Sequence, residues 1–218
     1  NVSNFSRSVF EDMRRGGVTA ANCTSCVWES FSETMRNFAR WKTWLRDNAD
    51  LITQVYTTDD IQRAKRERKT GIILGWQNSS GIEDRLDTLA LFHELGLRIV
   101  QLTYNTQNLV GCGCYEQRDG GLSDFGHDVR SEMNRLGILC DLSHVGAKTS
   151  EDAIRASKQR VAYSHCLPAG LKRLSQNPVG RPASPGSPGV ETPGSTYKVP
   201  CRDSEGFLTT RRGGFQTR

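Results

Sequence analysis

The first 167 residues alternate short apolar runs with longer amphipathic stretches, and this alternation restricts the possible fold more than any other feature. Apolar runs of strand length lie at 17–23, 71–77, 98–104, 139–143 and 161–164. Helical patterns, with apolar residues every three or four positions, lie at 30–46, 59–69, 82–95, 123–136 and 149–157. Asp59 or Asp60 is the expected cap of the second pattern, and Ser123 and Gly137 are the expected start and stop of the fourth. Strands that alternate with longer helices predict a parallel sheet covered by helices, which is the α/β class.

Two α/β architectures are open, a doubly wound sheet and a barrel. A dinucleotide-binding sheet needs a Gly-x-Gly-x-x-Gly turn after an early strand, but Gly111-Cys112-Gly113 lies in a loop and lacks the third glycine. Polar residues instead follow several apolar runs, where barrel enzymes build their sites. We therefore predict an incomplete TIM-type (β/α)8 barrel with about six of its eight strands, counting one strand cut off at residue 1.

The composition changes at residue 168. All seven prolines lie at or after Pro168, and the tail 168–218 holds eight basic residues against three acidic ones. A segment rich in Pro and Gly is typical of disordered sequence, and we predict a disordered or frame-shifted tail after a partial α/β barrel at 1–167. The charges of residues 1–167 balance, so no basic face indicates nucleic-acid binding.

The apolar stretches and the cysteines indicate in which cellular compartment the protein is expected. No apolar stretch approaches the ~20 residues that cross a bilayer, and the seven cysteines lack the spacing of a disulfide scaffold, which favours reduced thiols. We expect a soluble protein of the cytoplasm. The chain begins at Asn1 without Met, so an upstream segment with an export signal or anchor could precede it.

Two apolar runs end in the same dipeptide, Ser143-His144 and Ser164-His165. Alternation along each strand places the two imidazoles at the carboxyl end of neighbouring strands. A single strand-end histidine is more often a packing residue, but two that converge favour a metal site, since imidazole is the commonest metal ligand. His144 and His165 are therefore the candidate metal ligands.

Longer motifs around these histidines resemble the membrane dipeptidase (renal dipeptidase) family. The matching segments are Gly120-Gly121-Leu122-Ser123-Asp124-Phe125-Gly126, Glu132-Met133-Asn134-Arg135-Leu136-Gly137, Asp141-Leu142-Ser143-His144-Val145 and Tyr163-Ser164-His165. The resemblance covers residues 1 to about 171, and it implies an amidohydrolase-type barrel that hydrolyses dipeptides with two zinc ions. It also implies that His144 and His165 are zinc ligands and that the C-terminal part of the barrel is missing or replaced.

Other family positions carry different residues in this chain. Val2 falls where the family has the Asp of a His-x-Asp motif, and Gln77 falls where it has a bridging Glu. Gln77 would be a weak metal ligand, because its neutral carbonyl cannot neutralise two divalent cations. By the same resemblance, Tyr104 takes the place of a substrate-contacting His, and Lys158 that of an Arg that holds the dipeptide carboxylate.

These residues leave more than one function open. The first hypothesis is a zinc-dependent dipeptidase that uses metal-activated water on a small dipeptide, with this chain an incomplete or impaired copy that binds one or no zinc ion. The alternative is a non-catalytic barrel relative that binds a small ligand or partner. A hydrolase of another amide, a lactone or a lactam is a third possibility, because fold does not fix the substrate. A homodimer is compatible with each.

Overall fold

The computed structural model describes residues 5–165, and residues 1–4 and 166–218 lie outside the described part. The predicted tail at 168–218 and the predicted strand at residue 1 therefore fall outside it. The chain divides into two compact units, Asn1–Val100 and Gln101–Arg218, and each is described by itself.

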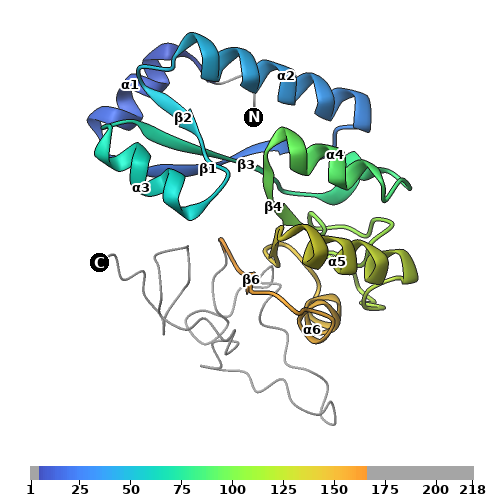
Figure 1. Ribbon diagram of the computed structural model, residues 1–218. Helices are drawn as coiled ribbons and strands as arrows, with labels where there is room; N and C mark the ends of the chain where they lie inside the picture. Colours follow the sequence, from blue (N-terminus) through green and yellow to red (C-terminus); the bar gives the residue numbers. More distant parts are fainter. Residues whose placement is uncertain (1–4, 166–218) are drawn as a thin grey trace. The chain divides into compact units, whose positions relative to one another are not determined.

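The first unit contains most of the strands (Figure 1). Its elements are α1 (Arg7–Arg15), β1 (Ala20–Cys26), α2 (Phe31–Asp47), β2 (Ile52–Gln54), α3 (Thr58–Arg66), β3 (Thr70–Trp76), the 3-10 turn η2 (Ser79–Ile82), α4 (Thr88–Leu95) and β4 (Leu97–Gln101), whose last residue begins the second unit. Strand β3 pairs in parallel with β1, β2 and β4, and all seven of its residues are buried. A strand buried on both faces is typical of a parallel sheet covered by helices.

Aromatic side chains fill the core of this unit. The ring of Phe92 on α4 lies 4.7 Å from that of Trp76 on β3 and 5.2 Å from that of Phe38 on α2, measured between centroids. All three side chains are at most 1 % exposed. These contacts pack α2 and α4 against the sheet and bury the apolar stripe of each helix.

Helix α3 is capped two or three residues earlier than the sequence indicated. We expected Asp59 or Asp60 to cap it, but Thr57 is the N-cap and Asp60 completes a capping box. The carboxylate of Asp60 accepts hydrogen bonds of 2.8 Å from the backbone N–H groups of Tyr56 and Thr57. Burial acts to raise the pKa of Asp60, but these hydrogen bonds and the nearby Arg63 outweigh it and lower the pKa below its ordinary value.

The second unit begins with a long loop that leads into α5 (Asp124–Leu136). The elements β5 (Leu139–Asp141), α6 (Ala147–Arg155) and β6 (Val161–Ala162) follow (Figure 1). The two short strands pair in parallel. Ser123 caps α5 and Gly137, at φ +74°, ends it, as the sequence predicted.

The predicted α/β class with parallel strands is confirmed, and the described residues contain six strands where a closed (β/α)8 barrel has eight. The sixth strand is β2, which was not predicted because Ile52 is its single apolar residue and no apolar run marks it. Helix α1 was not predicted. The helix expected over 82–95 begins only at Thr88, because η2 and the turns that follow it occupy 79–87. Within residues 5–165, no helix is both long and apolar enough to cross a membrane.

Candidate metal centre

His144 and His165 lie together in the second unit, as the sequence predicted. Their Nε2 atoms are 2.9 Å apart, and their ring centroids are 4.9 Å apart at 56°. The register of the parallel pair brings the two histidines together. Asp141 of β5 lies opposite Ala162 of β6. His144 follows Asp141 by three residues, and His165 follows Ala162 by three residues. Equal offsets from a paired position bring the two side chains out of the strands side by side.

A buried carboxylate connects the two strand ends. Asp141, 2 % exposed, accepts hydrogen bonds from the backbone N–H of Ser143 at 3.0 Å and of Ser164 at 3.1 Å. It also accepts from the hydroxyls of both serines. The Ser143 hydroxyl in turn accepts from the backbone N–H of His165 at 3.1 Å. Asp141 therefore fixes the backbone from which both imidazoles project.

The outer nitrogen of each imidazole is held by an acceptor. Nδ1 of His144 lies 2.7 Å from Oδ1 of Asn105, and Nδ1 of His165 lies 2.7 Å from the Ser164 hydroxyl oxygen. Because Ser164 donates its own proton to Asp141, its oxygen accepts from the His165 ring. This network assigns the proton of each neutral ring to Nδ1 and leaves a lone pair on each Nε2.

Two lone pairs that face each other at 2.9 Å repel, so the arrangement fits a cation between them. Zinc–nitrogen bonds of about 2.0–2.1 Å span this separation with little movement. Acceptors on the outer nitrogen are also what orients histidine ligands in metal sites. The residues present thus fit the zinc ion that the sequence implied.

Tyr104 packs against the first imidazole. Its ring stacks on that of His144, with centroids 4.3 Å apart and planes within 21°. Burial, followed by the neighbouring charge of His165, lowers the pKa of His144 against the opposing effect of Asp141. A lowered pKa keeps this imidazole neutral near pH 7, and the neutral form is the one that binds metals.

The loop after β4 adopts a strained backbone to reach His144. Asn105 and His144 both have left-handed φ values, +66° and +60°. Gly113 makes the close approach possible, since a Cβ there would lie 2.2 Å from the backbone carbonyl carbon of Asn105. Non-glycine residues in this region of φ are uncommon and often mark functional sites.

The other predicted site residues lie elsewhere. Lys158 precedes β6, whereas His165 follows it, and its backbone N–H donates to Asn134 Oδ1 at 3.2 Å. The structure therefore does not bring Lys158 to the imidazole pair. Gln77 belongs to the first unit, where it directly follows β3 and its backbone N–H donates to the Cys26 carbonyl at 2.9 Å. Its role as a metal ligand stays a prediction.

Sequence reasoning missed two functional residues, Asn105 and Asp141. Asp141 was visible as a carboxylate at the end of an apolar run, and its position in the same run as His144 was the available signal. In the part of the chain that the structure covers, no group of three His, Cys, Asp or Glu side chains is placed to hold a metal. The imidazole pair is the candidate centre.

Comparisons with known proteins agree with these features. The model of the membrane dipeptidase family, peptidase family M19, matches residues 8–178. Dipeptidase tcpJ of Claviceps purpurea is 33 % identical over 119 residues, which are 54 % of this chain and 28 % of that protein. An uncharacterized dipeptidase of Schizosaccharomyces pombe is 34 % identical over 134 residues, 60 % of this chain and 32 % of that protein.

A solved structure is also similar to this chain. The crystal structure of an amidohydrolase from Pseudomonas aeruginosa has 56 % sequence identity and a TM-score of 0.77, and the match covers 80 % of this chain and 53 % of that one. The chain thus spans about a third of the curated relatives and about half of this solved structure. From its motifs, its parallel strands and the family match over most of its length, the chain belongs to the membrane dipeptidase family, peptidase family M19.

Proposed function

We propose that the imidazole pair is part of the zinc centre of a dipeptidase-type peptide hydrolase. The observation that carries this proposal is the 2.9 Å approach of the two Nε2 atoms, each with its outer nitrogen held by an acceptor. The dipeptidase names of the curated relatives supply the substrate class, a small dipeptide. A zinc ion bound there supplies Lewis-acid chemistry, polarising a peptide carbonyl and making water more acidic.

We propose a separate role for each residue of the site. His144 and His165 bind the ion through Nε2, while Asn105 and Ser164 hold the Nδ1 protons and thereby the tautomer. Asp141 positions both strand ends. Tyr104 covers one face of His144 and excludes water from it. We propose that its hydroxyl contacts the substrate, in the place of the family histidine.

We propose that the centre holds one metal ion. Gln77 stands where the family has a bridging glutamate, and a neutral carbonyl leaves the charge of two divalent cations uncompensated. This position favours an impaired copy, or the non-catalytic relative that binds a small ligand. We also propose a cytoplasmic location, which the five free cysteines of the described residues favour, and a homodimer that size-exclusion chromatography can test.

Metal binding tests the proposal directly. The full chain is treated with a chelator, and Zn²⁺ is then titrated in by calorimetry, with Co²⁺ absorption as a second readout of the ligands. We expect close to one ion per chain, lost in His144→Ala and in His165→Ala. His127→Ala is the matched control, since His127 is an exposed histidine of α5 in the same unit.

Two results would change the conclusion. Stoichiometric zinc with no hydrolysis of any dipeptide in a panel supports the impaired copy and removes the active dipeptidase. No zinc binding by the folded chain removes the metal centre and leaves the non-catalytic relative.

A further inference from the structure

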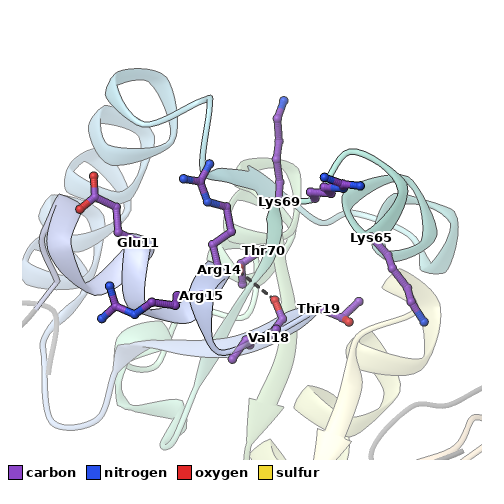
Figure 2. A pocket seen from close by; sticks show the side chains of 10 residues that line it. Glu11, Arg14, Arg15, Val18, Thr19, Lys65, Lys69 and Thr70 are labelled. Carbon is purple, nitrogen blue, oxygen red and sulfur yellow. Dashed lines mark hydrogen bonds between the residues drawn. The ribbon is translucent and has the colours of Figure 1, made fainter.

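The first unit contains a hollow with a strongly basic lining, made of residues that the candidate metal centre does not use. Its volume is about 830 Å³. It is lined by five cationic side chains, one acidic side chain and four other residues, namely Arg14, Arg15, Lys65, Arg68, Lys69, Glu11, Gly17, Val18, Thr19 and Thr70. Figure 2 shows that side chains of α1 and of the α3–β3 segment surround it, with Val18 and Thr19 between them.

This hollow lies at the amino ends of the strands. Val18 and Thr19 lead into β1, Thr70 is the first residue of β3, and the Thr70 hydroxyl donates to the Val18 carbonyl at 2.8 Å. Gln77 follows the carboxyl end of the same strand, so β3 separates the two by roughly 20 Å at about 3.3 Å per residue. The hollow is therefore a different place from the sheet edge at which the family builds its catalytic site.

Ion pairs account for only part of this charge. Arg15 pairs with Asp12, and the Lys69 ammonium lies 3.1 Å from the Glu67 carboxylate. Glu11, the single acid of the lining, is itself paired with Arg7 at 3.2 Å. Two of the five cations and the one acid are thus already satisfied by neighbours.

Three cations remain without an ion pair. Within residues 5–165, no carboxylate lies within 4 Å of Arg14, Lys65 or Arg68. All three side chains are exposed. Arg14 has only a longer-range interaction, which helps to lower the pKa of Asp50. These three groups supply the uncompensated charge of the hollow.

Helix dipoles explain some basic residues here, but not all of them. Helices α1 and α3 both end at the hollow, and cations are favoured near a helix C-terminus, which carries about −0.5 charge. Two such ends offset about one of the three unpaired charges. The charge that these helix ends leave uncompensated favours an anionic ligand with more than one negative charge.

Arg68 occupies a turn position that glycine usually takes. It lies just after the C-cap of α3 with φ at +56°, a left-handed position where glycine is the usual residue. Its backbone N–H donates to the Lys65 carbonyl at 3.2 Å, so the turn is formed despite the side chain. An arginine at this position puts a cation at the hollow at the expense of backbone strain.

We propose that this hollow binds the dianionic phosphate group of a small soluble ligand. The guanidinium groups of Arg14 and Arg68 can donate paired hydrogen bonds to phosphate oxygens, and the Lys65 ammonium acts as a point charge. Thr19, partly exposed in the floor, has a hydroxyl that can donate a further hydrogen bond. Binding here is independent of the metal centre.

Phosphate titration tests the proposal with a pair of adjacent residues. Lys65 lines the hollow, whereas Arg66, also exposed and on the same helix, does not. Inorganic phosphate, and then glycerol phosphate, is titrated into the full chain at constant low ionic strength, because salt screens exposed charges. We expect Lys65→Gln to weaken phosphate binding about fivefold or more and Arg66→Gln less than about twofold, since both remove one charge but only one contacts the ligand.

Arg68→Gly separates binding from folding. Glycine relieves the left-handed strain, so the phosphate-free variant should melt no lower than the parent chain, yet it should bind phosphate about fivefold more weakly. Equal effects of Lys65→Gln and Arg66→Gln would overturn the proposal, as would the absence of any phosphate binding at low ionic strength. Binding to vesicles of phosphatidic acid without binding to the soluble phosphates would overturn it in favour of a lipid surface.

Discussion

Replacing Asp141 by asparagine tests the link between the buried carboxylate and the metal ligands. The carboxylate accepts four hydrogen bonds, two from backbone N–H groups and two from the hydroxyls of Ser143 and Ser164. A hydrogen bond to a charged acceptor contributes about 1.5–3 kcal/mol and a neutral one about 0.5–1.5 kcal/mol. The difference is about 1–1.5 kcal/mol for each bond, so weakening four of them would cost about 4–6 kcal/mol. Relief of the buried charge offsets part of this, so we expect a loss of about 2–4 kcal/mol in the free energy of unfolding.

The same substitution should change the proton position on His165. The amide NH₂ of the new Asn would donate to the Ser164 oxygen, so the Ser164 hydroxyl would turn its proton toward Nδ1 of His165. The imidazole would then carry its own proton on Nε2, the atom that faces His144. A ring protonated at Nε2 cannot bind a metal through that atom, and loss of such a supporting group typically weakens metal affinity about 10–100-fold.

Two measurements check this prediction. Urea unfolding followed by tryptophan fluorescence gives the change in stability, and calorimetric titration of Zn²⁺ at pH 7 gives the change in affinity. Asp128→Asn is the control, because it removes the same charge from an exposed position on α5 in the same unit. If Asp141→Asn remains folded and binds zinc within about twofold of the parent chain, the proposed role of the carboxylate is wrong.

Three further predictions concern stability. Arg130 is fully buried with Nε and Nη1 unpaired among the described residues, so Arg130→Met should raise the free energy of unfolding by about 1–3 kcal/mol, and a lower urea midpoint would contradict this. Gly113→Ala should cost about 1–3 kcal/mol, since its Cβ would displace the Asn105 backbone, and a calorimetric titration should show weaker zinc binding as well. Asp60→Asn should cost about 1 kcal/mol at pH 7. Because the folded-state pKa of Asp60 is lowered, its stabilisation exists above the unfolded pKa of about 3.9 and disappears as pH falls through the folded pKa, so thermal melts of the two proteins should converge at acid pH.

The sequence predictions that agree with the structure rest on local residue patterns. Buried strands such as β3 are continuous apolar runs, and the two Ser-His strand ends repeat the same pattern, so the class of fold and the imidazole pair could both be predicted. Helix α5 was predicted with its cap and its stop, because Ser123 and Gly137 are favoured at those positions for local reasons.

The features that were not predicted depend on tertiary contacts, which the spacing of residues in the sequence does not indicate. Strand β2 reads Ile-Thr-Gln, so no apolar run marks it in the sequence. Asn105 reaches His144 only because the loop after β4 takes a left-handed turn beside a glycine. Lys158 was inferred from the family resemblance alone, and it lies before β6, whereas His165 lies after it. Its role in substrate binding stays a prediction. The positions of these residues are determined by tertiary contacts.

The closeness of the two histidines in the chain has a consequence for how the centre is assembled. They are 21 residues apart, and Asn105 and Asp141 belong to the same unit. The entropic cost of closing a loop grows only as (3/2)RT ln n, so a loop this short forms readily. Chains fold from the N-terminus as they are synthesised, so a nascent chain can form this imidazole pair soon after residue 165 leaves the ribosome. Metal capture at that stage would hold the ends of β5 and β6 side by side before the rest of the chain is made.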